Sequence, residues 1–134
     1  MILETGTFGA PTPQILNVDQ LTDFCIFFEN EEVAVGINPD VVSPKICDFN
    51  YFPMEYKKIV VDKLKINLAK IKNNINRTHI ENTIKVLQQD FNEKEIDQNI
   101  RNFVKYSDYM DKFRNTDSWR DLLPELAEVI EKRL

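Results

Sequence analysis

Glycine, histidine and cysteine are scarce in this sequence, and their scarcity excludes several kinds of protein and site. Three glycines in 134 residues make a long flexible linker unlikely to be encoded here, and there is one histidine. The two cysteines, Cys25 and Cys47, are 22 positions apart with no Cys-x-x-Cys pair, so they cannot supply the four close ligands of a zinc or iron–sulfur site. We interpret them as small buried side chains of a protein in a reducing compartment.

A long apolar run and an excess of basic residues are missing as well. No stretch approaches the roughly 20 apolar residues of a membrane span, and the opening MILETGTFGA does not have the pattern of a signal peptide. The net charge is -5, and residues 1–54 hold 8 acidic residues and 1 basic residue. A dedicated nucleic-acid-binding protein normally carries a basic excess. We therefore expect a cytoplasmic protein that binds neither membrane nor nucleic acid.

What the chain does contain favours one domain with a substantial core, because 43% of its 134 residues are hydrophobic. Segments 14–18 and 32–38 have the composition of short strands. Between them, Asp19 is a candidate helix cap, and four apolar residues share one helical face: Leu21, Phe24, Cys25 and Phe28. Strand, helix and strand in this order predict a βαβ unit with a parallel strand pair.

From residue 53 onward the pattern is helical. Pro53 suits the first position of a helix that extends to about Ile71. Thr78 with Glu81, and Asn92 with Glu95, have capping-box spacing and predict two further helices. Thr116 or Asp117 is expected to cap a single turn through Trp119, and the last helix starts at Leu123–Pro124. The predicted fold class is thus α+β and predominantly helical, with one βαβ unit followed by about four helices.

The domain prediction follows from these segments. We expect a single domain over 1–134, in which 1–10 is an N-terminal extension, 11–52 is the βαβ unit with its connector, and 53–134 is the helical part. A two-stranded parallel pair has open edges that invite pairing. This predicts a protein partner or a homo-oligomer formed through the sheet edges.

No group of residues in the sequence forms a convincing catalytic or metal site. The lysines of 53–72 are typical of a solvated helix face, and His79 has no nucleophile or carboxylate pattern around it. The triplet Asn76–Thr78 matches a glycosylation sequon, but Thr78 is better explained as a cap. Four carboxylates near the C-terminus are more typical of capping and ion pairs than of a metal site: Asp108, Asp111, Asp117 and Asp121. We therefore assign no catalytic, cofactor-binding or metal-binding residue.

Three motifs in order resemble the C-terminal portion of twitch-domain radical S-adenosylmethionine (SAM) proteins, which are frequent in phages and marine bacteria. They are PTPQILNVDQLTDFCIFFEN, INPDVVSPKICDFNYFPMEYKKIVVDKL and FVKYSDYMDKFRNTDSWRDLLPEL, and together they cover nearly the whole chain from about Pro11. The matching residues are Asn17, Pro39, Pro44, Pro53, Lys57, Asp111, Arg114, Asn115, Pro124, Glu125 and Leu126. The third motif is the most distinctive: a helix that ends in Asp-x-x-Arg-Asn, a short linker and Pro-Glu-Leu.

The chain departs from that family where the chemistry would be. The Cys-x-x-x-Cys-x-x-Cys loop, the Gly-Gly-Glu segment and the auxiliary-cluster cysteines are absent. The resemblance implies a 4Fe-4S cluster and SAM for a complete family member, while this chain alone is expected to bind neither. It implies a non-catalytic C-terminal segment or subunit that completes the barrel and caps the substrate side. The alternative is a stand-alone helical protein–protein interaction module, possibly encoded by a phage.

The sequence also assigns structural roles at the C-terminal motif. Asp111 and Arg114 are spaced i, i+3, a pair that contributes only a few tenths of a kcal/mol on an exposed helix. We therefore expect Arg114 to tie the helix end to the following linker. Trp119 is expected to pack in a groove before Pro124 restarts the helix. With Asn17 and Pro53, these residues form the predicted structural motif.

Overall fold

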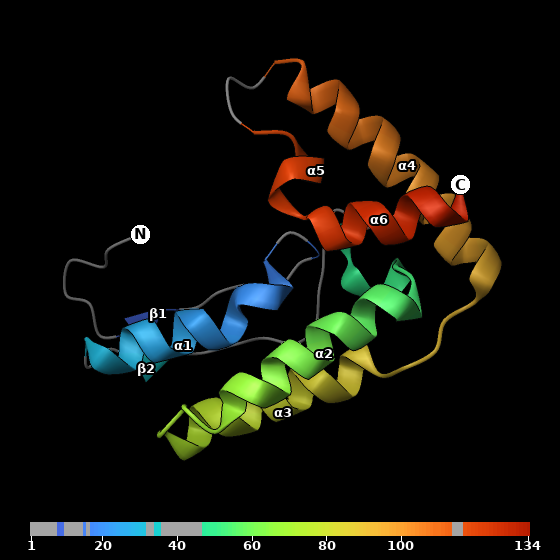
Figure 1. Ribbon diagram of the computed structural model, residues 1–134. Helices are drawn as coiled ribbons and strands as arrows, with labels where there is room; N and C mark the ends of the chain where they lie inside the picture. Colours follow the sequence, from blue (N-terminus) through green and yellow to red (C-terminus); the bar gives the residue numbers. More distant parts are fainter. Residues whose placement is uncertain (1–7, 10–14, 16, 32–33, 36–46, 114–116) are drawn as a thin grey trace.

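Helices make up most of the chain that the computed structural model describes, which comprises residues 8–9, 15, 17–31, 34–35, 47–113 and 117–134 (Figure 1). In chain order the elements are β1 (Phe8–Gly9), the 3-10 helix η1 (Val18–Gln20), α1 (Leu21–Asn30), β2 (Ala34–Val35), the 3-10 helix η3 (Phe49–Tyr51), α2 (Met54–Leu68), α3 (Asn74–Leu87), α4 (Glu93–Asp111), α5 (Trp119–Leu122) and α6 (Pro124–Arg133). In Figure 1, α2 and α3 run side by side, and α4, α5 and α6 gather at the opposite end of the molecule.

The predicted α+β class and its βαβ unit are wrong, because the described residues form an all-helical fold. Their one extended pairing is a parallel contact of two residues a side, in which Phe8 and Gly9 lie opposite Ala34 and Val35. Its first partner belongs to the expected N-terminal extension, not to segment 14–18. Two residues a side are too few to form a sheet. The expectation of partners at open sheet edges loses its basis with the βαβ unit.

The strand prediction for segment 14–18 is wrong at its described residues, because Ile15 and Val18 are buried without forming a strand. Ile15 and Val18 are almost fully buried, but Asn17 lies in a turn and Val18 begins the 3-10 helix η1. The Gln20 N–H donates to the Asn17 carbonyl oxygen at 2.9 Å and opens η1. A short apolar run fits a strand and a buried turn equally well, because periodicity cannot distinguish the two. Asp19 falls within η1, and no side chain caps α1.

Helix α3 starts one turn earlier than the sequence analysis predicts. Asn73 is its N-cap, and its side-chain oxygen accepts from the N–H groups of Ile75 at 2.8 Å and Asn76 at 3.1 Å. Thr78 is therefore inside the helix, and its hydroxyl donates to the Asn74 carbonyl oxygen at 2.9 Å. An Asn cap that satisfies two backbone N–H groups outweighs the capping-box pattern that begins at Thr78.

This difference yields a direct test of where α3 begins. Asn73→Ala should lower the free energy of unfolding by about 1 kcal/mol, the usual cost of losing an N-cap, measured by urea unfolding. Thr78→Ala should change it by less than about 0.5 kcal/mol, because this exposed hydroxyl only bonds back within the helix. A larger loss in Thr78→Ala than in Asn73→Ala would place the cap where the capping box predicts it.

Helices α2, α4 and α6 form close to their predicted positions. Pro53 is the residue before α2 and its carbonyl accepts the first helical bonds, so it is a cap and not the first helical residue. Asn92 caps α4 through the N–H groups of Lys94 at 2.9 Å and Glu95 at 3.2 Å. Pro124 opens α6, where its missing N–H has no cost. The starts of α4 and α6 match the prediction, and the start of α2 lies one residue later than predicted.

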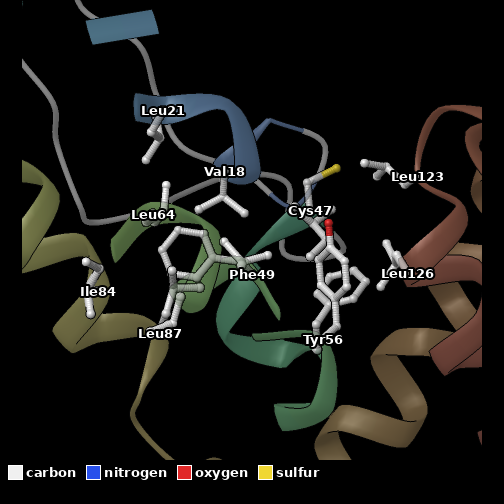
Figure 2. Close-up of a cluster of buried hydrophobic side chains, with 14 of the residues drawn as sticks. Val18, Leu21, Cys47, Phe49, Tyr56, Leu64, Ile84, Leu87, Leu123 and Leu126 are labelled. Atoms are coloured by element: carbon white, nitrogen blue, oxygen red, sulfur yellow. The ribbon is translucent and has the colours of Figure 1, made fainter. Parts of the chain in front are cut away.

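One buried cluster joins the segments on both sides of residue 53 (Figure 2). Phe49 of η3 lies at its centre in Figure 2, with Val18 on one side and Leu64, Ile84 and Leu87 around it. Both cysteines are buried in the cluster as free thiols, as the sequence predicts. The helical part and the segment that contains η1 and α1 therefore share a single core.

Candidate functional site

The C-terminal motif folds around two aromatic residues and an ion pair. Trp119, the first residue of α5, is 3% exposed. Its indole packs edge-on against Phe103 of α4, with ring centroids 5.2 Å apart. The indole N–H donates to Asp108 Oδ1 at 2.9 Å, and the backbone N–H of Trp119 donates to Asp111 Oδ2 at 3.2 Å. Two carboxylates on the last turns of α4 therefore hold the start of α5.

Arg120 completes this arrangement, which we call the clasp: Phe103, Asp108, Asp111, Trp119 and Arg120. The Arg120 guanidinium donates to both oxygens of Asp108 and lies over the Trp119 ring at 4.6 Å. The hydrogen bond from Arg120 holds the pKa of the Asp108 carboxyl below its usual range, and the same bond raises the pKa of Arg120. All of these groups pair with each other, which is typical of a structural contact and not of a reactive site.

The predicted structural residues are distributed as follows. Asp111 and Trp119 meet in the clasp, and Pro124 begins α6 next to it. Asn17 and Pro53 precede η1 and α2. The predicted tie through Arg114 falls outside the described residues, as do Pro39, Pro44 and Asn115 of the family resemblance. The pairing of Asp108 with Arg120 does not follow from the sequence, because the two residues are 12 positions apart and belong to different helices.

A second feature is a groove beside η1 and α1, with a volume of about 360 Å³. It is lined by Asn17, Gln20, Leu21, Asp23, Phe24 and Phe27. Phe27 is 58% exposed although it is a large aromatic residue, and its ring meets Phe28 edge-on at 5.2 Å. The groove therefore has a largely apolar surface, and its lining includes the exposed aromatic side chain of Phe27.

A third feature is Lys57 on α2, which the sequence analysis placed on a solvated lysine face. That interpretation is wrong for Lys57, which is 1% exposed. Its ammonium donates to the Asn50 carbonyl oxygen at 2.7 Å and lies 3.5 Å from the Gln89 carbonyl oxygen, with the Phe91 ring centroid 5.1 Å away. Burial lowers the pKa of Lys57 to about 8, against the opposing charges of Asp48 and Asp90.

Lys57 should give the stability of the chain a pH dependence. Its pKa is 10.5 when unfolded and about 8 when folded, so between these values the unfolded chain binds more protons and the free energy of unfolding rises with pH. Between about pH 7.5 and pH 9, the wild-type chain should gain about 1 kcal/mol relative to Lys57→Met, as linkage predicts. Urea unfolding at each pH measures the difference. Burial also raises the pKa of Cys25, but Cys25 is present in both proteins and cancels in this comparison.

The matched control for this prediction is Lys58→Met, because Lys58 is the next residue of α2 and is exposed. The difference between wild type and Lys58→Met should not vary with pH over the same range. A pH-independent difference between wild type and Lys57→Met would contradict the buried charge.

The remaining candidates from the sequence have structural explanations. Asn76 is 3% exposed, and its amide donates to Glu29 of α1 at 2.9 Å, so the sequon asparagine makes a tertiary contact. Asp121 accepts from the Ser118 hydroxyl at the start of α5, at 3.2 Å. The part of the chain that the structure describes contains no cluster of three histidine, cysteine or acidic residues that could hold a metal ion. None of its helices has the length and apolar character needed to cross a membrane.

Comparisons with protein-family models, with curated proteins and with solved structures find no match to this chain.

Proposed function

We propose that this chain is a non-catalytic, protein-binding part of an enzyme assembly: the C-terminal portion of a radical SAM protein, or a separate subunit that complements one. The observation that carries the binding role is the apolar groove beside α1, whose lining residue Phe27 is largely exposed. The family resemblance supplies the class of partner, namely a protein with the cluster-binding core. The helices would cap the substrate side of that partner. Because the described residues form no βαβ unit, the chain would not complete a barrel by adding strands.

The cysteines of this chain do not fit an iron–sulfur cluster. Cys25 is fully buried and Cys47 is 8% exposed, and burial raises the pKa of the Cys25 thiol to about 12. A cluster requires thiolates, which this apolar environment disfavours. Any cluster and any SAM site of the assembly would therefore belong to the partner.

The charges around Phe27 specify the chemistry of the partner surface. Asp23 stands four residues before Phe27 on α1, and Glu31 follows directly after the last residue of the helix. Every charged residue of 17–31 is acidic. Lys63 of α2 lies 3.8 Å from Asp19 and 3.9 Å from Asp23, and it offsets part of this charge. A helix with an apolar stripe and flanking lysines or arginines is the complementary occupant of the groove.

A substitution of Phe27 tests whether such a partner binds in the groove. Phe27→Glu should weaken binding of the chain to a radical SAM core protein encoded in the same genome by at least about tenfold, or 1.4 kcal/mol, because exposed aromatic anchors dominate such interfaces. Isothermal titration calorimetry under anaerobic conditions measures the affinity. The free energy of unfolding should stay within about 0.5 kcal/mol of wild type, because Phe27 is 58% exposed.

Tyr109→Glu is the matched control, because Tyr109 is also a 58% exposed aromatic residue but lies on α4. It should bind like wild type. Equal losses in Phe27→Glu and Tyr109→Glu would contradict the groove as the docking site. If the isolated chain bound a cluster and cleaved SAM after anaerobic reconstitution, the non-catalytic role would be refuted.

The second candidate is a stand-alone interaction module. The single buried cluster that joins η1, α1 and the helical part favours it, because a chain with one closed core can fold without a partner. Size-exclusion chromatography with light scattering separates the two. A cooperative monomer that never associates with a radical SAM core protein would favour the module, and a chain that is soluble only with that partner would favour the fragment.

A further inference from the structure

The outer side of α4 carries a stripe of exposed aromatic residues. Tyr106, Tyr109 and Phe113 are all exposed, and their spacing of three and four residues places them on one face of the helix. The rings of Tyr109 and Phe113 contact each other, with centroids 5.1 Å apart. Contiguous exposed apolar patches on a protein surface commonly mark interaction sites. We call this stripe, together with the basic residues beside it, the α4 face.

The basic residues of the α4 face form a row along one side of the aromatic stripe. Arg101, Lys105 and Lys112 are exposed and are spaced by four and seven residues. Among the residues that the structure describes, no carboxylate forms an ion pair with Arg101 or Lys105, while the charge of Lys112 acts on Asp108. Asp108 and Asp111 accept hydrogen bonds from α5. The α4 face therefore combines an apolar stripe with positive charge.

These are the features that the groove beside α1 requires of its occupant. Phe24 and Phe27 line the groove, and every charged residue of 17–31 is acidic. The aromatic stripe can bury apolar surface against the two rings, and the basic row can face the acidic residues. Lys63, which lies 3.9 Å from Asp23, opposes the basic row but offsets only part of the acidic charge.

The two surfaces belong to one molecule but cannot meet within it. Helices α1 and α4 contribute to a single core, and they lie apart in Figure 1. We propose that the α4 face of one copy of this chain docks in the α1 groove of a second copy. This contact is head-to-tail, so each pair still has one unused groove and one unused α4 face. Association should therefore continue beyond two chains unless it closes into a ring.

This contact uses the groove of the proposed function but does not depend on the identity of the partner proposed there. A core protein that occupies the groove would displace the second copy, because both bind the same surface. The experiment therefore uses the whole chain alone. Its failure would leave the proposed complex with a radical SAM core protein untouched, and failure of that complex would leave the head-to-tail contact untouched.

Sedimentation velocity of the whole chain measures the association. The average mass of the wild type should rise with concentration between about 10 µM and 1 mM, as expected of a weak, transient interface. Phe27→Glu should disable the groove and Tyr109→Glu the α4 face, so each variant alone should stay monomeric. An equimolar mixture of the two should form a dimer and nothing larger, because each variant retains the surface that the other lacks.

Ile66→Glu is the matched control, because Ile66 is 73% exposed on α2 and outside both surfaces, and it should associate like wild type. Higher salt should weaken the association of the wild type, since acidic and basic surfaces meet in it. Phe27 and Tyr109 are each 58% exposed, so both variants should fold, which circular dichroism checks.

Three results would overturn the proposal. The first is a wild-type chain that stays monomeric up to about 1 mM, which needs no variant; binding of a single-stranded oligonucleotide by that monomer, and not by Tyr109→Glu, would then assign the α4 face to nucleic acid. The second is a mixture of Phe27→Glu and Tyr109→Glu that does not associate. The third is association that only Tyr109→Glu abolishes, which indicates a symmetric contact between two α4 faces.

Discussion

Replacing Trp119 by alanine should lower the free energy of unfolding by about 3–5 kcal/mol, the usual cost of removing a large buried aromatic side chain. The indole is 3% exposed, packs against Phe103, and donates to Asp108. Its loss opens a cavity and leaves α5 tied to α4 chiefly through Arg120 and the Asp111 contact. Because Trp119 is the single tryptophan, unfolding of this variant in urea has to be followed by circular dichroism.

Two further variants separate the contributions to the clasp. Trp119→Phe keeps a ring against Phe103 but removes the indole N–H, so it should cost roughly 1–3 kcal/mol. Leu122→Ala is the control on the same helix, and because Leu122 is 61% exposed it should change stability by less than about 0.5 kcal/mol. If Trp119→Ala were as stable as wild type, the clasp would not hold the C-terminal helices.

The second large effect is expected at Phe49. Phe49→Ala should also cost about 3–5 kcal/mol, because this ring is fully buried at the centre of the core in Figure 2. It joins Val18 of η1 to α2 and α3 within one cluster. Its loss should therefore destabilise the whole chain and not only the segment around η3. Phe113→Ala, at a 71% exposed aromatic residue, is the control and should have little effect.

Two probes test whether the core is cooperative. Fluorescence reports on Trp119 in α5, while circular dichroism reports on all helices. Both urea midpoints should fall together in Phe49→Ala, since a single core unfolds as one unit. If the circular dichroism midpoint fell while the Trp119 midpoint stayed at its wild-type value, the two parts would be separate domains.

Local signals explain what the sequence could predict. The Asn92 cap and Pro124 at the start of α6 act within one turn of their own helix. The apolar seam of α4 also follows from spacing alone, because Ile96, Ile100 and Phe103 recur every three or four residues and all three are buried. Such features depend on backbone geometry that neighbouring residues set, so they can be inferred without knowledge of the tertiary structure.

The predictions that were wrong or missing have a common cause. In each case, contacts with residues distant in the sequence outweigh the local pattern. Ile15 and Val18 have a strand-like pattern, but core packing buries them in a turn. In the sequence, Lys57 has the same pattern as the exposed lysines of α2. In the structure it is buried, and its ammonium donates to the Asn50 and Gln89 carbonyl oxygens. The partner of Asp108, Arg120, lies beyond the end of its helix. Periodicity and capping rules describe residues that are close in the sequence. The contacts of Lys57 and of Asp108 join residues that are distant in the sequence, so these rules could not predict them.

The most direct test of the proposed function is the mass of the chain in solution with a radical SAM core protein encoded in the same genome. Anaerobic size-exclusion chromatography with light scattering should show a one-to-one complex with wild type and with Tyr109→Glu. With Phe27→Glu, the two proteins should elute separately. Separate elution of the wild-type chain, or an unchanged complex with Phe27→Glu, would contradict docking through the α1 groove.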